Sequence, residues 1–173
     1  MDVVYEAQRR SLEGFLEGYD SAQANAEVKG RSVLMAALTN VVPAARAGIA
    51  IVLLDDGADA RVALADGVNT LHAMLGNAAL DPAIEAPVLR RLIDGGADVN
   101  GVADEFGTPL QVLFAQFRYT DEVLAPFYDV LFSYGDLDLL KIGAYAKSAY
   151  TMAVNSARRQ ALRARMEQHL QVW

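Results

Sequence analysis

Apolar stretches with the spacing of helices recur along this chain, and each is followed by a glycine at a regular interval. These glycines stand 39 residues apart and are Gly18, Gly57, Gly96 and Gly135. A residue with positive φ commonly ends a helix, and glycine adopts that conformation without steric cost. A constant interval of this length is typical of repeat proteins, in which each unit is one supersecondary element stacked on the next. The pattern therefore predicts an array of helical repeats.

A second, shorter helix is predicted within each unit, after a polar segment. Residue types that cap helix N-termini stand before these starts, at Ser32, Asn69, Thr108 and Ser148. Each unit then runs turn, short helix, connector, longer helix and glycine. The apolar positions expected to form one continuous core are Leu34, Leu54, Leu71, Ile93, Leu110 and Leu131.

The repeats divide one domain, residues 1–173, into five parts. We expect residues 1–20 to contain one N-terminal capping helix (3–17), followed by repeats at 21–59, 60–98 and 99–137. A C-terminal capping repeat at 138–173 ends in a helix from 156 to 170 with its arginines facing outward. Terminal units of an array are expected to be atypical, because one face of each meets water.

Four segments resemble ankyrin repeats. Residues 53–59 (LLDDGAD) and 92–100 (LIDGGADVN) are similar to the end of such a repeat, and residues 69–73 (NTLHA) and 107–111 (GTPLQ) are similar to its start. The resemblance implies an all-α, ankyrin-like solenoid of stacked helix-turn-helix repeats with capping helices at both ends. It also implies that His72 ties adjacent loops together. The ankyrin period is about 33 residues, so each unit here carries extra residues between its two helices.

Composition narrows the function classes. The chain has 173 residues, no cysteine and a formal net charge of −7, and all but one of its acidic residues precede Leu139. Disulfides, thiolate metal sites and cysteine nucleophiles are excluded. An acidic surface repels phosphate backbones, so nucleic acid is not an expected ligand. We find no signal-peptide pattern and no apolar run long enough for a membrane span, and we expect a cytoplasmic protein.

Catalytic signatures are not found in the sequence. The two histidines, His72 and His169, are far apart in the chain, and there is no Gly-x-Ser-x-Gly motif. The acidic pairs Asp55-Asp56 and Asp104-Glu105 fall in predicted turns, where solvated carboxylates are ordinary. We therefore expect a non-enzymatic protein with no metal and no cofactor.

The resemblance implies binding of a protein partner through the concave face, which is formed by the hairpin tips and the short helices. Phe106 has two interpretations, as a binding anchor or as a residue packed on the next hairpin. The candidate partner-binding residues are Glu27, Lys29, Met35, Asp66, Val68, Asp104, Glu105, Phe106, Gln111 and Tyr145.

Two functions follow as expectations. In the first, the concave acidic face binds a basic protein, and the size and acidity resemble small bacterial ankyrin proteins that neutralise a toxin. In the second, the chain is a structural or assembly subunit that docks in a larger complex or self-associates. The basic last helix, opposite an acidic body, would permit head-to-tail pairing. We expect a monomer or weak self-association.

Overall fold

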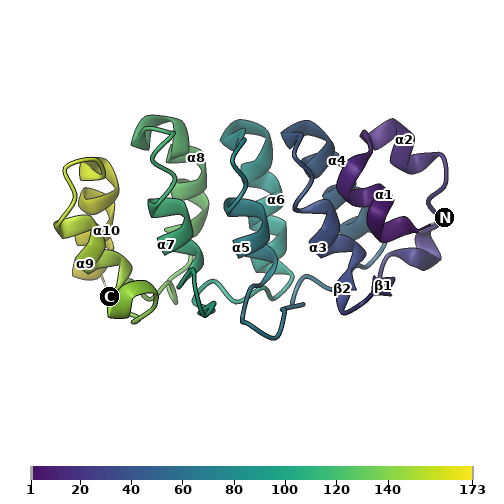
Figure 1. Cartoon of the computed structure of the whole chain (residues 1–173). Helices are drawn as coiled ribbons and strands as arrows, with labels where there is room; N and C mark the ends of the chain where they lie inside the picture. The colour runs from purple at the N-terminus through teal and green to yellow at the C-terminus, as the bar shows by residue number, and fades with distance from the viewer. Residues whose placement is uncertain (1, 173) are drawn as a thin grey trace.

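The computed structural model describes residues 2–172 and is mostly helical, with two short strands. Ten α-helices form five pairs that stand side by side, from the N-terminal pair to the C-terminal pair (Figure 1). The first helices of the pairs are α1 (Val3–Arg9), α3 (Val33–Ala37), α5 (Thr70–Leu75), α7 (Pro109–Phe114) and α9 (Ala149–Val154). The second helices are α2 (Leu12–Leu16), α4 (Pro43–Asp55), α6 (Pro82–Asp94), α8 (Asp121–Leu131) and α10 (Gln160–Val172).

The first helices pack against one another in one row and the second helices in another. Within the first row α1 contacts α3, α3 contacts α5, α5 contacts α7 and α7 contacts α9; the second row repeats this order from α2 to α10. Loops and hairpins project at one edge of the array, and the helix-to-helix connectors lie at the opposite edge (Figure 1). One antiparallel hairpin has strands, β1 (Glu27–Val28) and β2 (Arg31–Ser32). Two 3-10 turns complete the elements, at Ser21–Gln23 and Ala144–Ala146.

The predicted N-caps of the short helices are confirmed. The side chains of Ser32, Asn69, Thr108 and Ser148 each accept a hydrogen bond from a backbone N–H in the first turn of the helix that follows. Helices of five or six residues are too short to be stable alone. Caps and packing against neighbouring units therefore hold these helices in place.

The expectation of a single N-terminal capping helix at 3–17 is wrong. The chain is extended at Arg10, and the Ser11 hydroxyl caps a new helix by accepting from Gly14 N. Helix α1 packs on α3 and α2 packs on α4. The N-terminal segment is thus a complete helix pair rather than half of one.

Two of the four periodic glycines end their helices as predicted. Gly57 and Gly96 have φ of 89° and 100°, and the N–H of the following alanine bonds to the carbonyl of Leu53 or Leu92. Gly18 and Gly135 do not have positive φ. Helix α8 already ends at Leu131, well before Gly135, so this glycine lies in the following turn.

The core is continuous through all five pairs, but two expected members are displaced by one residue. Leu34, Leu71, Leu110 and Leu131 are buried as predicted. Leu54 and Ile93 are only partly buried, and their neighbours Leu53 and Leu92 are fully buried instead. The helices α4 and α6 are therefore rotated so that these neighbours face the core.

Polar side chains in the connectors join each unit to the one before it. Asn77 donates its side-chain amide to Leu38 O at 2.8 Å, and Gln116 donates to Asn77 O at 3.0 Å and Leu75 O at 2.6 Å. Between α4 and α6, the fully buried Arg46 pairs with Glu85 at 2.5 Å and donates to the carbonyls of Asn40 and Ala79. Buried carbonyls need such donors, since an unpaired polar group is costly in the core.

Arg159 corrects the expectation that the C-terminal arginines face outward. It precedes α10, which begins at Gln160 rather than Ser156, and its side chain is buried. The guanidinium donates to the carbonyls of Phe114, Gln116 and Tyr119 at 2.9–3.0 Å and contacts Asp121 at 3.3 Å. Arg159 therefore fastens the last helix pair to the connector of the unit before it.

Candidate binding groove

The loops at the hairpin edge bring most of the predicted site residues to one side of the molecule. Isolated β-bridges close three of these loops, between Ala63 and Asn69, Ala103 and Gly107, and Ile142 and Ser148. Exposed at the tips are Glu27, Lys29, Asp66, Asp104, Glu105, Phe106 and Tyr145, and Val68 is partly buried. The tips of neighbouring units also touch, because Asp104 N donates to Asp66 O at 2.9 Å.

Two adjoining hollows lie beside these tips, on the face of the short helices. One has a volume of about 260 Å³ and extends from α7 to α9; the other has a volume of about 220 Å³ and extends from α5 to α7. Phe106 lines both and is 52% exposed. We call the two hollows together the groove. Its apolar lining consists of Val68, Ala73, Gly76, Phe106, Val112, Ala115, Ala144, Tyr145 and Met152.

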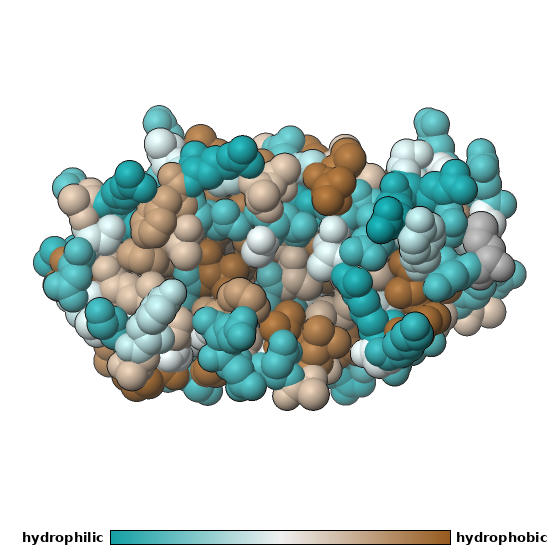
Figure 2. Space-filling model, viewed as in Figure 1, coloured by the Kyte–Doolittle hydropathy of each residue, from teal (hydrophilic) through white to brown (hydrophobic). Residues whose placement is uncertain are grey.

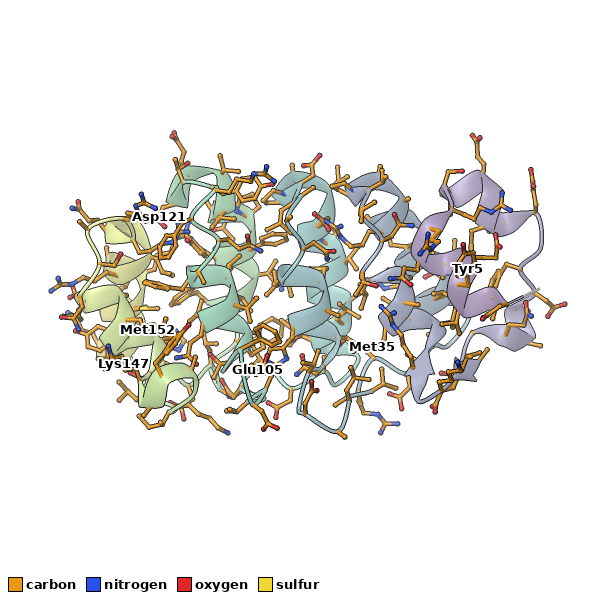
Figure 3. The ribbon with its side chains drawn as sticks, viewed as in Figure 1. Tyr5, Met35, Glu105, Asp121, Lys147 and Met152 are labelled. Atoms are coloured by element: carbon orange, nitrogen blue, oxygen red, sulfur yellow. The ribbon has the colours of Figure 1, made fainter. Side chains whose placement is uncertain are left out.

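The groove is apolar, and charge is confined to its border. Figure 2 shows apolar side chains gathered over the middle of this face, with hydrophilic side chains around them. Glu105 lines the hollow beside α9, and in Figure 3 it lies at the hairpin edge below α7, across from Met152 and Lys147. The expected acidic face is thus an apolar floor with acidic residues at the tips.

Two of the predicted binding residues belong to the interior. Met35 is only 3% exposed and Gln111 only 1% exposed. The Gln111 side chain accepts from Thr108 N and Ala144 N and donates to Lys147 O at 2.9 Å. Its polar atoms are therefore used to join the third hairpin to the fourth, and they are not available to a partner.

His72 has the structural role that the sequence indicated. Its Nε2 lies 2.8 Å from Gly107 O, and its Nδ1 lies 3.1 Å from Asn69 N and 2.8 Å from Asn69 Oδ1. Burial favours the neutral ring, and with the proton on Nε2 the ring donates to Gly107 O while Nδ1 accepts from Asn69 N. Burial lowers the pKa of His72, against the smaller opposing effects of the Gly107 hydrogen bond and the charges of Asp66 and Asp98. His72 joins the second hairpin to the third, as Gln111 joins the third to the fourth.

A larger hollow of about 770 Å³ lies outside the groove, beside the loop at residues 57–62. Most of its polar side chains have partners. Asn25 bonds to Gly57 O and Asp59 N, Arg61 pairs with Asp59 at 2.9 Å, and Arg91 pairs with Asp55 at 2.5 Å. Exposed ion pairs of this kind contribute little binding or stability by themselves. Unlike the groove, this hollow has no aromatic side chain among its described lining residues.

The acidic pairs named in the sequence analysis are either bonded within the chain or exposed at a tip. Within residues 2–172, no group of three or more His, Cys, Asp or Glu side chains could hold a metal ion. Asp55 is taken by Arg91, and Asp56 accepts from the Tyr19 hydroxyl at 2.9 Å. Asp104 and Glu105 are exposed at a tip. The distinctive feature of this face is therefore an apolar recess flanked by exposed aromatic rings.

Part of the groove floor was not predicted from the sequence. Gly76 and Ala115 line it, and both stand just after a short helix, where the connector begins. Their small size is what leaves the hollow open. The 39-residue spacing between them was a usable signal, since it places them at the same point of successive units.

Comparisons with known proteins agree with the fold and leave the activity open. No protein-family model matches the chain, and no curated protein matches it. A solved structure, described as a functionally unknown protein from Leptotrichia buccalis C-1013-b, is similar with a TM-score of 0.75 and 22% sequence identity. The similarity covers 98% of this chain and 92% of that one. At this identity it shows a shared fold alone.

Among the described helices, none has both the length and the apolar character needed to cross a membrane.

Proposed function

We propose that this chain is an ankyrin-like repeat protein that binds a protein partner through the groove and catalyses no reaction. The observation that carries the proposal is Phe106, an exposed aromatic side chain at a hairpin tip that borders two apolar hollows. Aromatic residues placed centrally in a recess are the usual anchors of protein interfaces. The stacked helix pairs, the capped short helices and the loop-tying His72 support the ankyrin-like assignment.

The proposed partner is a basic protein. Glu105 lines the groove, Asp66 and Asp104 lie exposed at the neighbouring hairpin tips, and the net charge of the chain is −7. Charges at the edge of an interface accelerate encounter and select the partner, whereas the apolar centre contributes most of the affinity. In the form that the resemblance implies, the partner is a basic toxin and this chain neutralises it.

The proposal is tested by replacing Phe106 with alanine and measuring capture of partners from a lysate of the source organism. Phe106→Ala should leave the thermal unfolding midpoint nearly unchanged, because the side chain is half exposed, and should weaken partner binding by about tenfold or more. The matched control is Ile84→Ala, which removes an exposed apolar side chain from α6 on the other row of helices. If both variants capture the same proteins as the wild type, binding through the groove is wrong.

The alternative proposal, an assembly subunit, draws on the C-terminal end of the array. Leu140 and Ile142 are both exposed in the loop before α9. Exposed apolar residues close together can mark a surface that another protein covers. In that case Leu140→Ser and Ile142→Ser, rather than Phe106→Ala, would release the chain from its complex.

A further inference from the structure

Tyr145 and Phe106 border the same end of the groove. The residues that line the hollow there suit one class of side chain. This inference rests on the proposed function and gives the partner's side chain a chemical class. We propose that the hollow between Phe106 and Tyr145 receives one cationic side chain of the partner protein, an arginine or a lysine. The hollow measures about 260 Å³, which is of the size that one long side chain occupies.

The lining suits the two ends of such a side chain. Val112, Ala115 and Met152 provide apolar contacts for the methylene groups of lysine or arginine. Phe106 and Tyr145 provide two aromatic rings, and the face of a ring attracts a cation when the two come within about 6 Å. The lining therefore combines apolar contacts for an aliphatic stem with two aromatic side chains that can receive a charged end.

Glu105 provides a negative charge for the cationic end of such a side chain. It is the only carboxylate among the lining side chains of this hollow, and it forms no ion pair with any other residue between 2 and 172. Gln111 and Gln116 also line the hollow, but their amides donate to backbone carbonyls of the chain itself. Glu105 is thus an unpaired acceptor beside two aromatic rings. A neutral apolar side chain would fill the hollow and leave this carboxylate without a partner.

The turn that carries Tyr145 adds an independent observation. Tyr145 has φ 56° and ψ 28°, Ala146 has φ 54°, and Lys147 N donates to Ala144 O across the turn. This left-handed conformation is unfavourable for residues with a Cβ, and glycine or asparagine is the usual choice. The conformation nevertheless holds the Tyr145 ring 84% exposed at the border of the hollow. Strained residues that persist in a fold are enriched at binding sites.

The test uses two short peptides as probes of the full-length chain. Acetyl-Gly-Gly-Arg-Gly-Gly-amide carries the cation, and the same peptide with citrulline is nearly identical in shape but neutral. Titration is followed by amide NMR shifts around Phe106, Ala144 and Met152. The arginine peptide should shift these resonances with a dissociation constant at least about fivefold lower than that of the citrulline peptide. Glu105→Gln should remove most of this difference.

Two variants of the turn separate binding from folding. Tyr145→Gly relieves the backbone conformation and removes the ring, so stability should rise or stay constant while the arginine peptide no longer binds. Ala146→Gly relieves the same turn and keeps the ring, so binding should persist within about twofold of the wild type. A Tyr145→Gly protein that binds the arginine peptide as the wild type does would overturn the role of the ring.

Failure of this inference is distinguishable from failure of the proposed function. Equal binding of both peptides, or binding of neither peptide, would contradict the proposal that the hollow receives a cationic side chain. If Phe106→Ala still abolishes capture of the natural partner in that case, the groove remains a protein-binding site for a different side chain. If Phe106→Ala also has no effect on capture, both proposals are wrong.

Discussion

His72 and Gln111 occupy the same position in successive units and perform the same task with different chemical groups. Each is the third residue of its short helix, each bonds back to the backbone of the N-cap residue, and each donates to a carbonyl of the next hairpin. The amide Nε2 of glutamine takes the place of the imidazole Nε2, and the amide oxygen takes the place of Nδ1. The tie between hairpins therefore requires one donor and one acceptor at this position, and does not require histidine.

This equivalence gives a pH-dependent prediction at the residue scale. Burial lowers the pKa of His72 below its ordinary value of 6.5, so the unfolded chain binds a proton at a higher pH than the folded chain. The stability contributed by neutral His72 is complete above about pH 6.5 and is lost as the pH falls toward the lower pKa of the folded state. His72→Gln keeps both hydrogen bonds and removes the titration.

Urea unfolding at pH 7.5 and pH 5.5 measures the effect. The wild type should lose more free energy of unfolding between the two values than His72→Gln does, and the two proteins should be close in stability at pH 7.5. An equal loss in both proteins would mean that His72 is not the group that titrates.

Some positions of the predicted site residues could be inferred from the sequence, and others could not. The tip residues and Phe106 could be predicted, because turn signals locate the loops and an aromatic residue among acidic ones stands out. Met35 was misassigned to the surface, and Gln111 lines the hollow with its polar atoms already bonded within the chain, since helical spacing alone does not say which side of a short helix faces a neighbour. The 39-residue interval between His72 and Gln111 was sufficient to give them one role.

At the scale of elements, the caps were predictable and the N-terminal break was not. The capping serines, asparagine and threonine act locally, through bonds to amides within three residues. The break at Arg10 and Ser11 depends in addition on packing of α1 against α3 and of α2 against α4. A continuous helix from 3 to 17 could place only one of its halves in register with these partners. Tertiary packing therefore overrides the local helical pattern.

The last helix pair gives a prediction at this scale. Arg159 holds it to the preceding connector through three carbonyls and Asp121, and a lysine has no planar array of donors with which to replace these bonds. Arg159→Lys should accelerate amide hydrogen exchange in α9 and α10 by about tenfold or more, since hydrogen bonds to charged groups contribute about 1.5–3 kcal/mol each. Exchange in α3 to α6 should change little, because units of an array contact only their neighbours.

Hydrogen exchange of the full-length protein, read peptide by peptide after quenching and with Arg158→Lys as the control, makes this comparison. Arg158 is the exposed neighbour of Arg159, so its replacement should leave the last helix pair as protected as in the wild type. Uniform acceleration throughout the chain in Arg159→Lys would show that the array unfolds as one unit, and would contradict local docking of α9 and α10.

At the scale of the whole molecule, the net charge and the repeat could be predicted from the sequence, whereas the distribution of charge on the binding face could not. The excess of acids is a property of composition, whereas the apolar floor of the groove depends on which side chains the stacking leaves uncovered. Ala73, Val112 and Met152 are partly exposed because none of the helices within residues 2–172 packs in front of the short-helix row (Figure 3). On this face, Asp66, Asp104 and Glu105 lie at the exposed loop tips rather than on the groove floor.

The oligomeric state is a prediction at this scale. We expect light scattering to give the monomer mass of 18.7 kDa over a range of about 5 to 200 μM in 150 mM salt, because the charged surface keeps molecules apart. Mass that rises with concentration and falls again in 1 M salt would instead indicate head-to-tail pairing of the basic C-terminal helix with the acidic body. That outcome would favour the assembly-subunit proposal.

The buried pair of Arg46 and Glu85 has a consequence for how this chain can change in evolution. These residues are each the fourth of their helices, α4 and α6, and the corresponding residue of α8 is Leu124. Loss of the block at residues 60–98 would place the Arg46 guanidinium against a leucine and leave a buried charge without a counterion, a change that costs about 3–5 kcal/mol. The repeats resemble one another in shape, yet this one cannot be lost alone without cost. Its loss would require a second substitution, at Arg46, in the same step to restore stability.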